Sequence, residues 1–111
     1  MPPSQNQEPV EWVTKGTIRK YFNDGRFAER VKSGELTTIL KRNSHPDPPP
    51  TGEPLCTRSQ IVYYHAPDGH AVAVVHQYLR PDGTIGASGL PDPKRLILQD
   101  RIISVRSEPP I

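Results

Sequence analysis

The sequence predicts an α+β fold in which N-terminal helices pack on one face of a small antiparallel β-sheet, a hairpin meander. Between residues 14 and 33, apolar residues recur at helical spacing and capping residues stand at the expected ends. Two Asp-Gly pairs, Asp68-Gly69 and Asp82-Gly83, separate runs rich in β-forming residues and predict consecutive hairpins. With 111 residues, the chain has room for one small domain.

The N-terminal part of the chain favours helices. Thr14 can cap a first helix that runs through Phe22. Residues 26–33 predict a second helix, because Gly34 stands just beyond its C-terminus. Residues 36–40 permit either a strand or a continuation of the helix.

Proline defines the segments that cannot join the core. Residues 43–54 hold five of the 14 prolines, and we expect them to form an exposed loop inside a single domain spanning residues 10–106. The ends of the chain, residues 1–9 and 107–111, are also Pro-rich and are expected to be disordered tails.

The second half of the chain reads as β-structure. Strands over residues 59–65 and 71–79, followed by a third after the second Asp-Gly pair, predict a meander over residues 59–88. Asp92 and Pro93 fit the N-cap and first position of a short helical turn through residue 98. A last strand is expected over residues 101–105.

The register of the hairpins decides which side chains share a face. If both Asp-Gly pairs are two-residue loops, Ile61 lies opposite His76, Tyr63 opposite Val74, His65 opposite Val72, and Arg80 opposite Ile85. Small apolar residues then occupy the face that suits the helices. The other face carries most of the titratable side chains, namely Tyr63, His65, His70, His76, Tyr78 and Arg80.

This polar face predicts a candidate site. His76, Tyr78 and Arg80 would be successive neighbours about 6.7 Å apart along one strand. Histidines 65, 70 and 76 are candidate acid–base groups, arginine binds phosphate, and Tyr63 and Tyr78 can stack on bases. The set matches the needs of a metal-independent ribonuclease. The alternative is that these are hydrogen-bonded sheet residues with no ligand.

A second basic feature follows the hairpins. In the string Gly89-Leu90-Pro91-Asp92-Pro93-Lys94-Arg95, two cations enter where a helix could begin, and helix N-termini bind anions. Lys94 and Arg95 are therefore candidate RNA-phosphate contacts, together with Arg80. The alternative is a rigid connector whose Asp92 caps the turn.

Charge is distributed unevenly along the chain. The formal net charge is +2, but the Pro-rich segments hold four of the 12 acidic residues and no Lys or Arg. The remaining segments therefore carry 14 basic against 8 acidic residues, a net charge of +6. Such an excess favours an anionic partner, RNA in particular, although a positive solvated surface explains it equally well.

Several classes of site and location are disfavoured by the sequence. Cys56 is the only cysteine, and no pair of histidines has metal-ligand spacing, so we expect neither a metal nor a cofactor. The longest apolar run, residues 71–75, is far shorter than the ~20 residues of a membrane helix. The first residues lack a basic start and an apolar stretch, so we expect a cytoplasmic protein without membrane contact.

Two segments, Tyr64-His65-Ala66-Pro67-Asp68-Gly69-His70 and Pro91-Asp92-Pro93-Lys94-Arg95, resemble the cytotoxic ribonuclease domain of ribosome-inactivating colicins. That domain has consecutive hairpins with Asp-Gly-type turns and ends in a similar Pro-Asp-Pro-Lys-Arg string. The resemblance implies action on RNA and a phosphate-contacting role for Lys94 and Arg95. The catalytic carboxylates of that domain have no counterpart here, because the corresponding residues are Gln60-Ile61-Val62-Tyr63.

Two functions therefore remain open, and the sequence leaves it undecided whether the protein is an enzyme. The first is RNA binding, with ribonuclease activity of a toxin-like kind and a protein antidote as a further partner. The second is a non-catalytic interaction module that docks a protein through the sheet face or the Pro-rich loop, since Pro-rich segments favour the polyproline II conformation.

Overall fold

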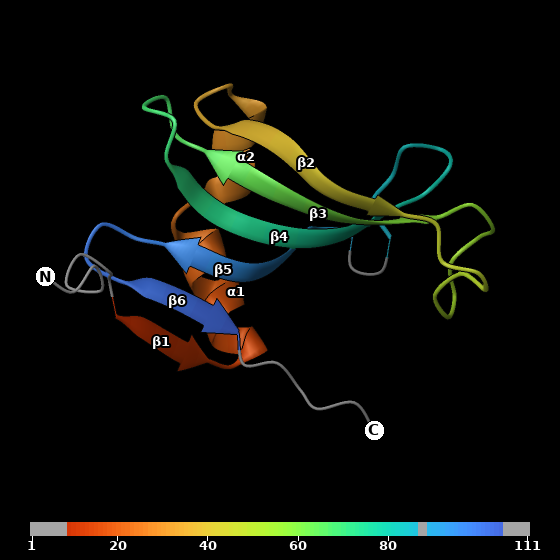
Figure 1. Cartoon of the computed structure of the whole chain (residues 1–111), viewed down its shortest axis with the longest axis horizontal. Helices are drawn as coiled ribbons and strands as arrows, with labels where there is room; N and C mark the ends of the chain where they lie inside the picture. The colour runs from red at the N-terminus through yellow and green to blue at the C-terminus, as the bar shows by residue number, and fades with distance from the viewer. Residues whose placement is uncertain (1–8, 87–88, 106–111) are drawn as a thin grey trace, which may run out of the picture.

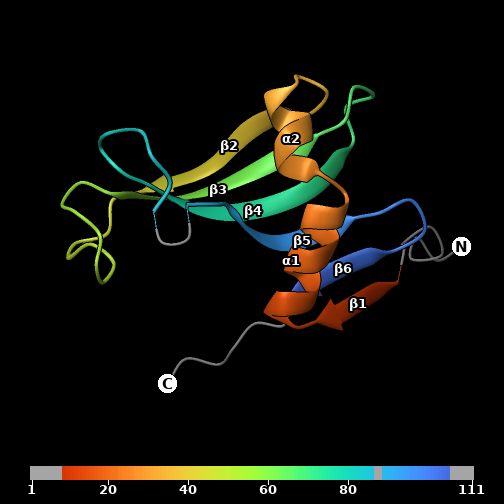
Figure 2. The same cartoon turned by 180° about the vertical axis from the view of Figure 1, so that it is seen from behind.

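The computed structural model describes residues 9–86 and 89–105, which form a six-stranded mixed sheet with two helices on one face (Figures 1 and 2). The sheet order is β1-β6-β5-β4-β3-β2. The elements are β1 (Val10–Val13), α1 (Lys15–Asp24), α2 (Phe27–Lys32), β2 (Thr37–Ser44), β3 (Arg58–His65), β4 (Ala71–Leu79), β5 (Asp92–Ile97) and β6 (Ile102–Val105). The α+β class is confirmed, but the sheet is larger than a hairpin meander. It is also not strictly antiparallel, because β1 runs parallel to β6.

Both predicted helices are present. The backbone N–H of Thr17 donates to the side-chain oxygen of Thr14, so Thr14 caps α1 as expected. Ile18 and Phe22 bury the inner side of α1 against the sheet, and the Phe22 ring stacks on Phe27 of α2 at 5.5 Å between centroids. The α1 helix lies mainly across β5 and β6, and α2 lies in front of the ends of β2 and β3 (Figure 2).

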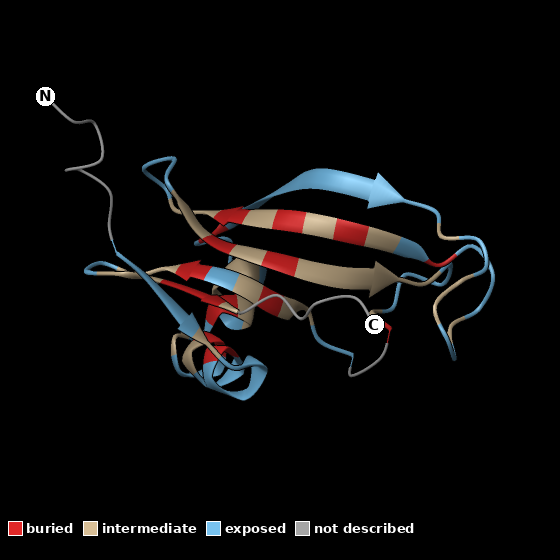
Figure 3. Cartoon of the chain, turned by 60° about the horizontal axis from the view of Figure 1, so that its bottom comes forward, coloured by how far each residue is buried: buried red, intermediate tan, exposed pale blue. Residues whose placement is uncertain are grey.

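The core lies between the helices and one face of the sheet. Along β3 and β4, buried residues alternate with partly exposed ones, as Figure 3 shows by its red and tan bands. The edge strand β2 is exposed along its whole length. Of the two alternatives for residues 36–40, the strand is therefore correct and the continued helix is wrong. The buried apolar residues are Ile18, Phe22, Phe27, Leu36, Val62, Tyr64, Ala73, Val75, Leu96 and Ile103.

The two Asp-Gly turns differ from the prediction in the same way. Each loop has three residues instead of two, because Pro67 and Pro81 each join the turn ahead of the Asp-Gly pair. In the first, Ala66 N–H donates to His70 O at 2.9 Å, and in the second, Arg80 N–H donates to Thr84 O at 2.9 Å. Proline favours the second position of a type I turn, and a glycine with positive φ closes such a loop.

In the first hairpin, a second irregularity cancels the effect of the longer loop. Next to the turn, His65 pairs with Ala71, so the predicted pairing with Val72 is wrong. Val72 is then an extra residue on β4, and beyond this β-bulge the register returns to the predicted one. The predicted pairs of Ile61 with His76 and of Tyr63 with Val74 are therefore confirmed.

The second hairpin has no compensating bulge, so its predicted register is wrong. Ile85 forms an isolated bridge with Leu79 instead of pairing with Arg80. It consequently lies on the side of the sheet that faces the helices. No third meander strand forms among the described residues up to 86, and the predicted partner of Tyr78, Ala87, lies outside the described residues.

The strand that pairs with the other side of β4 is β5, at residues for which the sequence predicted a helical turn. Asp92 pairs with His76, and Pro93 pairs with Val75. Pro93 lacks an N–H, and it is tolerated here beside a bulge that leaves Lys94 as the extra residue. Burial of Leu96 between β4 and β6 overrides the local helix signals.

The last and the first strand differ in whether the sequence predicted them. The expected last strand is confirmed as β6. The short strand β1 was not expected, because it is defined by parallel pairing with β6, far away in the sequence. Most of the predicted tails, residues 1–8 and 107–111, lie outside the described residues.

Candidate functional site

The sheet face turned away from α1 and α2, hereafter the open face, carries the candidate site. The pairings of the strands and their alternation with buried residues define it. Its side chains are mostly aromatic, polar or positively charged. They include Trp12, Ile39, Arg42, Ser59, Ile61, Tyr63, His65, Val74, His76, Tyr78, Arg95 and Ser104.

A shallow groove of about 400 Å³ lies on the open face between β1 and β3. One edge is formed by Trp12, which is 53% exposed, and the other by Tyr63. Lys94 and Arg95 contribute cations between them. The groove thus combines exposed aromatic rings with positive charge, which is the combination that binds unpaired nucleotides.

Arg95 is held in position without being neutralised. Its Nε donates to the hydroxyl of Ser104 on β6 at 2.7 Å. Among the described residues, no carboxylate lies within ion-pair distance of its guanidinium. The hydrogen bond orients the group and leaves its terminal nitrogens available for an anion.

Two lysines of the open face occupy β-bulges. Lys41 is the extra residue of the β2 bulge, and its ammonium lies 5.2 Å from the centroid of the Tyr63 ring. Lys94 is the extra residue of the β5 bulge and donates to Asp92 at 3.0 Å. Bulges redirect side chains and are frequent next to functional sites, so both lysines are well placed to contact a ligand on this face.

His76 is the best positioned of the predicted acid–base groups. Its Nε2 is hydrogen-bonded to the Ser59 hydroxyl at 2.8 Å, and the Tyr78 ring meets it edge-on at 4.7 Å. Burial lowers the pKa of His76, and the Lys94 ammonium lowers it further, while Asp92 acts in the opposite direction. Burial and the Lys94 charge therefore both favour the neutral form of His76.

The other two predicted histidines do not converge on His76. His65 lies on the open face beside Tyr63, and its Nδ1–H donates to Gly69 O at 2.9 Å. It is four residues from Ile61, the partner of His76, which corresponds to ~13 Å along the strand. His70 lies in the exposed turn next to Asp68. The structure therefore brings neither His65 nor His70 next to His76.

Arg80 is held in an ion pair with a buried carboxylate. Its guanidinium donates to both carboxylate oxygens of Glu53, at 2.7 and 3.3 Å, and the Glu53 side chain is 5% exposed. The pair ties the Pro-rich loop to the second hairpin. Its predicted role as a phosphate contact therefore has no support from this geometry.

The basis on which Lys94 and Arg95 were predicted to bind phosphate is also corrected. They lie in a strand and not at a helix N-terminus, because β5 replaces the predicted helical turn. Burial opposes ionisation of Asp92, but the hydrogen bond and charge of Lys94, together with Arg19, hold the pKa of Asp92 below its usual value. Lys94 is accordingly partly neutralised, whereas Arg95 is not.

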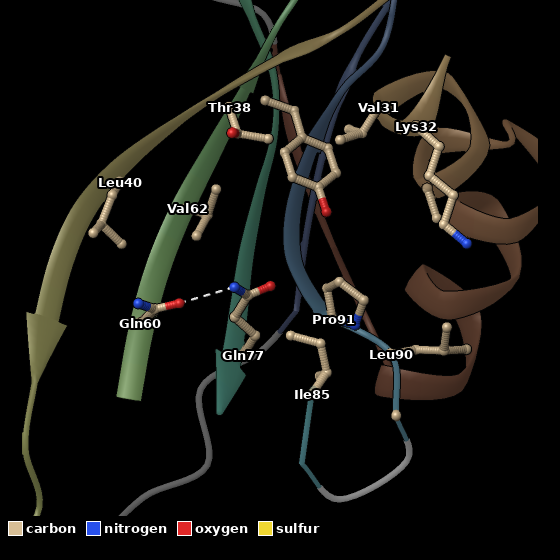
Figure 4. Close-up of a pocket in the computed structure, with 13 residues that line it drawn as sticks. Val31, Lys32, Thr38, Leu40, Gln60, Val62, Gln77, Ile85, Leu90 and Pro91 are labelled. Atoms are coloured by element: carbon tan, nitrogen blue, oxygen red, sulfur yellow. Dashed lines mark hydrogen bonds between the residues drawn. The ribbon is translucent and has the colours of Figure 1, made fainter. Parts of the chain in front are cut away.

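A second groove, of about 430 Å³, lies on the helix side between α2 and strands β2 to β4 (Figure 4). Across its floor, the Gln77 amide donates to Gln60 at 2.9 Å, and Gln60 donates to Asn43 at 3.2 Å. Its walls are mostly apolar, with Lys32 as a single cation among the lining residues. Because its central amides bond to one another, this groove is a weaker candidate for an anionic ligand than the open face.

The sequence did not single out three of the residues that form the open-face site. Trp12 could have been noticed as the only tryptophan, but its strand was not expected. Lys41 and Arg42 directly follow the apolar part of residues 36–40, and they belong to the site because β2 continues to Ser44.

No family model matches the chain, and comparisons with curated proteins and with solved structures gave no significant match. Among residues 9–86 and 89–105, no three His, Cys, Asp or Glu side chains come together as a metal site. None of the helices in the described part of the chain is long and apolar enough to cross a bilayer.

Proposed function

We propose that the open face binds single-stranded nucleic acid, with RNA as the form that the resemblance to colicin ribonuclease domains implies. The observation that carries the proposal is the groove in which Arg95, oriented by Ser104, lies with two aromatic rings, Trp12 and Tyr63. A flat sheet surface with exposed rings and cations is a common platform for unpaired bases.

The cations of the open face account for attraction to phosphate. Lys41, Arg42 and Arg95 have no ion-pair partner among the described carboxylates. Each can therefore replace a condensed counterion of the nucleic acid when it contacts a phosphate. Lys94 contributes less, because Asp92 already holds its ammonium.

The aromatic rings favour unpaired bases over a duplex. Trp12 and Tyr63 present ring surface on the open face, and base stacking requires a base whose own face is accessible. In a duplex that surface is covered by neighbouring base pairs. Trp12 and Tyr63 line the same groove as Arg95 and Tyr78 does not, so we assign stacking to Trp12 and Tyr63 instead of Tyr63 and Tyr78.

We restrict the proposal to binding. His76 lies close enough to Lys94 for the lysine charge to influence its pKa, so it is near one of the predicted phosphate-contacting groups. Cleavage of RNA needs a proton acceptor and a proton donor at the reacting phosphate. Neither His65 nor His70 lies beside His76 to complete such a pair, so the proposal covers binding only.

The experiment is fluorescence anisotropy of a labelled octauridylate at low salt, with the full chain. We expect the double variant Lys41→Ala/Arg95→Ala to weaken binding about tenfold or more, because two phosphate contacts are lost. Arg58→Ala is the matched control, since Arg58 is an exposed cation that shares the helix side with Gln60. Deoxyuridylate of the same length tests the preference for RNA.

Three results would decide against the proposal. They are no binding at low salt, binding that does not depend on salt, and equal losses in the double variant and in Arg58→Ala. The alternative of a protein-docking module, using the sheet face or the Pro-rich loop, predicts the first of these results.

A further inference from the structure

The strand pairings align six open-face residues in a single row that crosses the sheet. Trp12 pairs with Ser104, Ser104 with Arg95, and Arg95 with Val74. The row continues because Val74 pairs with Tyr63 and Tyr63 with Ile39. It therefore runs perpendicular to the strands, from the β1 edge to the β2 edge (Figure 1).

The spacing within this row follows from sheet geometry. Neighbouring strands are about 4.8 Å apart, so Trp12 and Tyr63, four strands apart, are separated by about 19 Å along the row. Arg95 stands midway between the two rings. Ser104 and Val74, on either side of Arg95, have short side chains and leave the space between the rings open.

We propose that a single nucleic-acid strand lies along this row, across the β-strands, and is held at three points. One base stacks on Trp12, another base stacks on Tyr63, and a phosphate between them contacts Arg95. This inference rests on the proposed function and adds to it the path and the minimum length of the ligand.

The side chains around Tyr63 fit such a ligand. The Lys41 ammonium now lies over the Tyr63 ring at 5.2 Å from its centroid. A base that stacks on this ring takes the place of the ammonium, and the flexible lysine can then turn to the phosphate of the same nucleotide. Lys41 would thus cover the Tyr63 ring in the free protein and contact a phosphate of the nucleic acid in the complex.

The distance between the rings sets the length of nucleic acid required. At the ~3.4 Å rise of stacked nucleotides, 19 Å corresponds to about six steps, and fewer when the strand is extended. A dinucleotide can therefore occupy one ring only, whereas an octanucleotide reaches both. The two ligands should respond differently when one of the rings is removed.

The single tryptophan provides a local probe, because its fluorescence reports on the Trp12 end alone. Diuridylate and octauridylate are titrated into the wild type, Tyr63→Ala, Tyr63→Phe and Tyr78→Ala, with quenching as the signal. We expect Tyr63→Ala to weaken octauridylate about tenfold and to leave diuridylate unchanged. Tyr63→Phe should retain the wild-type affinity, since the stacking surface remains.

Tyr78→Ala is the matched control, because Tyr78 pairs with Ser59 and is on the open face but outside the row. The inference is wrong if labelled octauridylate binds without quenching Trp12, if Tyr63→Ala weakens both lengths equally, or if Tyr78→Ala has the same effect as Tyr63→Ala. Anisotropy that shows no binding of labelled octauridylate at all would instead reject the proposed function.

Discussion

Along β3, Val62 and Tyr64 point towards the helices and are buried, whereas the alternate residues Ile61 and Tyr63 point to the open face and stay partly exposed. The same alternation continues on β4 and separates two kinds of chemistry across the thickness of one sheet. The helix side is dominated by aliphatic and aromatic packing. The open face holds unpaired cations and accessible rings.

If the open face binds nucleic acid as proposed, the difference between the two sides of the sheet separates stability from binding. The buried core involves helices α1 and α2 and the inner side of the central strands. Substitutions on the open face remove little of that packing, so binding and stability should respond to different residues. The following predictions test this separation, beginning with the largest expected effect.

The largest contrast concerns stability. Leu96→Ala should lower the free energy of unfolding by about 2–5 kcal/mol, because Leu96 is fully buried and its truncation leaves a cavity. Trp12→Ala should cost less than about 1 kcal/mol, since Trp12 is 53% exposed. Urea unfolding followed by far-UV circular dichroism measures both values. Comparable losses in the two variants would contradict the separation of the faces.

The second contrast lies within the open face, between a neutralised and an unneutralised cation. Arg95→Ala should reduce the slope of log affinity against log salt by about 0.7, the value for one phosphate contact with a single strand. Lys94→Ala should reduce it by less, because Asp92 shares the Lys94 charge. Salt titrations of octauridylate binding measure both slopes. A larger change for Lys94→Ala would reverse the assignment.

The third prediction concerns His76 and pH. Its pKa is lowered in the folded state, so unfolded chains bind more protons than folded ones as the pH falls below about 6.5. The stability that neutral His76 provides is present above that pH and is lost progressively as the pH falls below it. Lys94, Asp92 and Tyr78 are the charged or titratable groups that contact or influence it.

His76→Gln should therefore flatten the dependence of the urea midpoint on pH between 5 and 7. The variant should bind octauridylate as well as the wild type, and it should abolish any cleavage that the wild type shows, since a proton-transfer group affects rate more than affinity. The difference between the two pH profiles isolates His76 from the other histidines. Parallel profiles would show that His76 does not contribute.

The smallest effect is expected at Cys56, which belongs to neither face. Cys56 is exposed in the loop that precedes β3, three residues after Glu53, which forms the ion pair with Arg80. A thiol reagent should react with it in the native state nearly as fast as in urea, and labelling should leave the urea midpoint unchanged. Labelling that requires denaturant would show that the loop packs over the thiol.

How much could be predicted depended on the range of the interactions involved. The start of α1 after its N-cap Thr14 and the pairing of Tyr63 with Val74 follow from neighbouring residues and were predicted correctly. The loop length was wrong because the Asp-Gly pair was considered without the proline before it. Strand β5 was missed because its partners, β4 and β6, supply the burial that local signals lack.

The site shows the same division. Tyr63, His65 and His76 were assigned to one face from hairpin register alone, and they do share that face. Trp12 could not be added to them, since only the parallel pairing of β1 with β6 brings it to the same row. Arg80 was predicted to contact phosphate from its place in the sequence. Nothing at that place indicates that Glu53, 27 positions earlier, pairs with its guanidinium.

The bulge at Val72 also determines which changes in chain length the hairpin can tolerate. From Ala73 onwards, β4 pairs with β3 in the predicted register. This holds only because Val72 has no partner on β3. Loss of that residue would straighten the strand and keep Tyr63 opposite Val74. Loss of a residue farther along β4 would move every later side chain to the opposite side. Val72 is therefore the position in this strand where a single-residue deletion leaves the order of side chains on the open face intact.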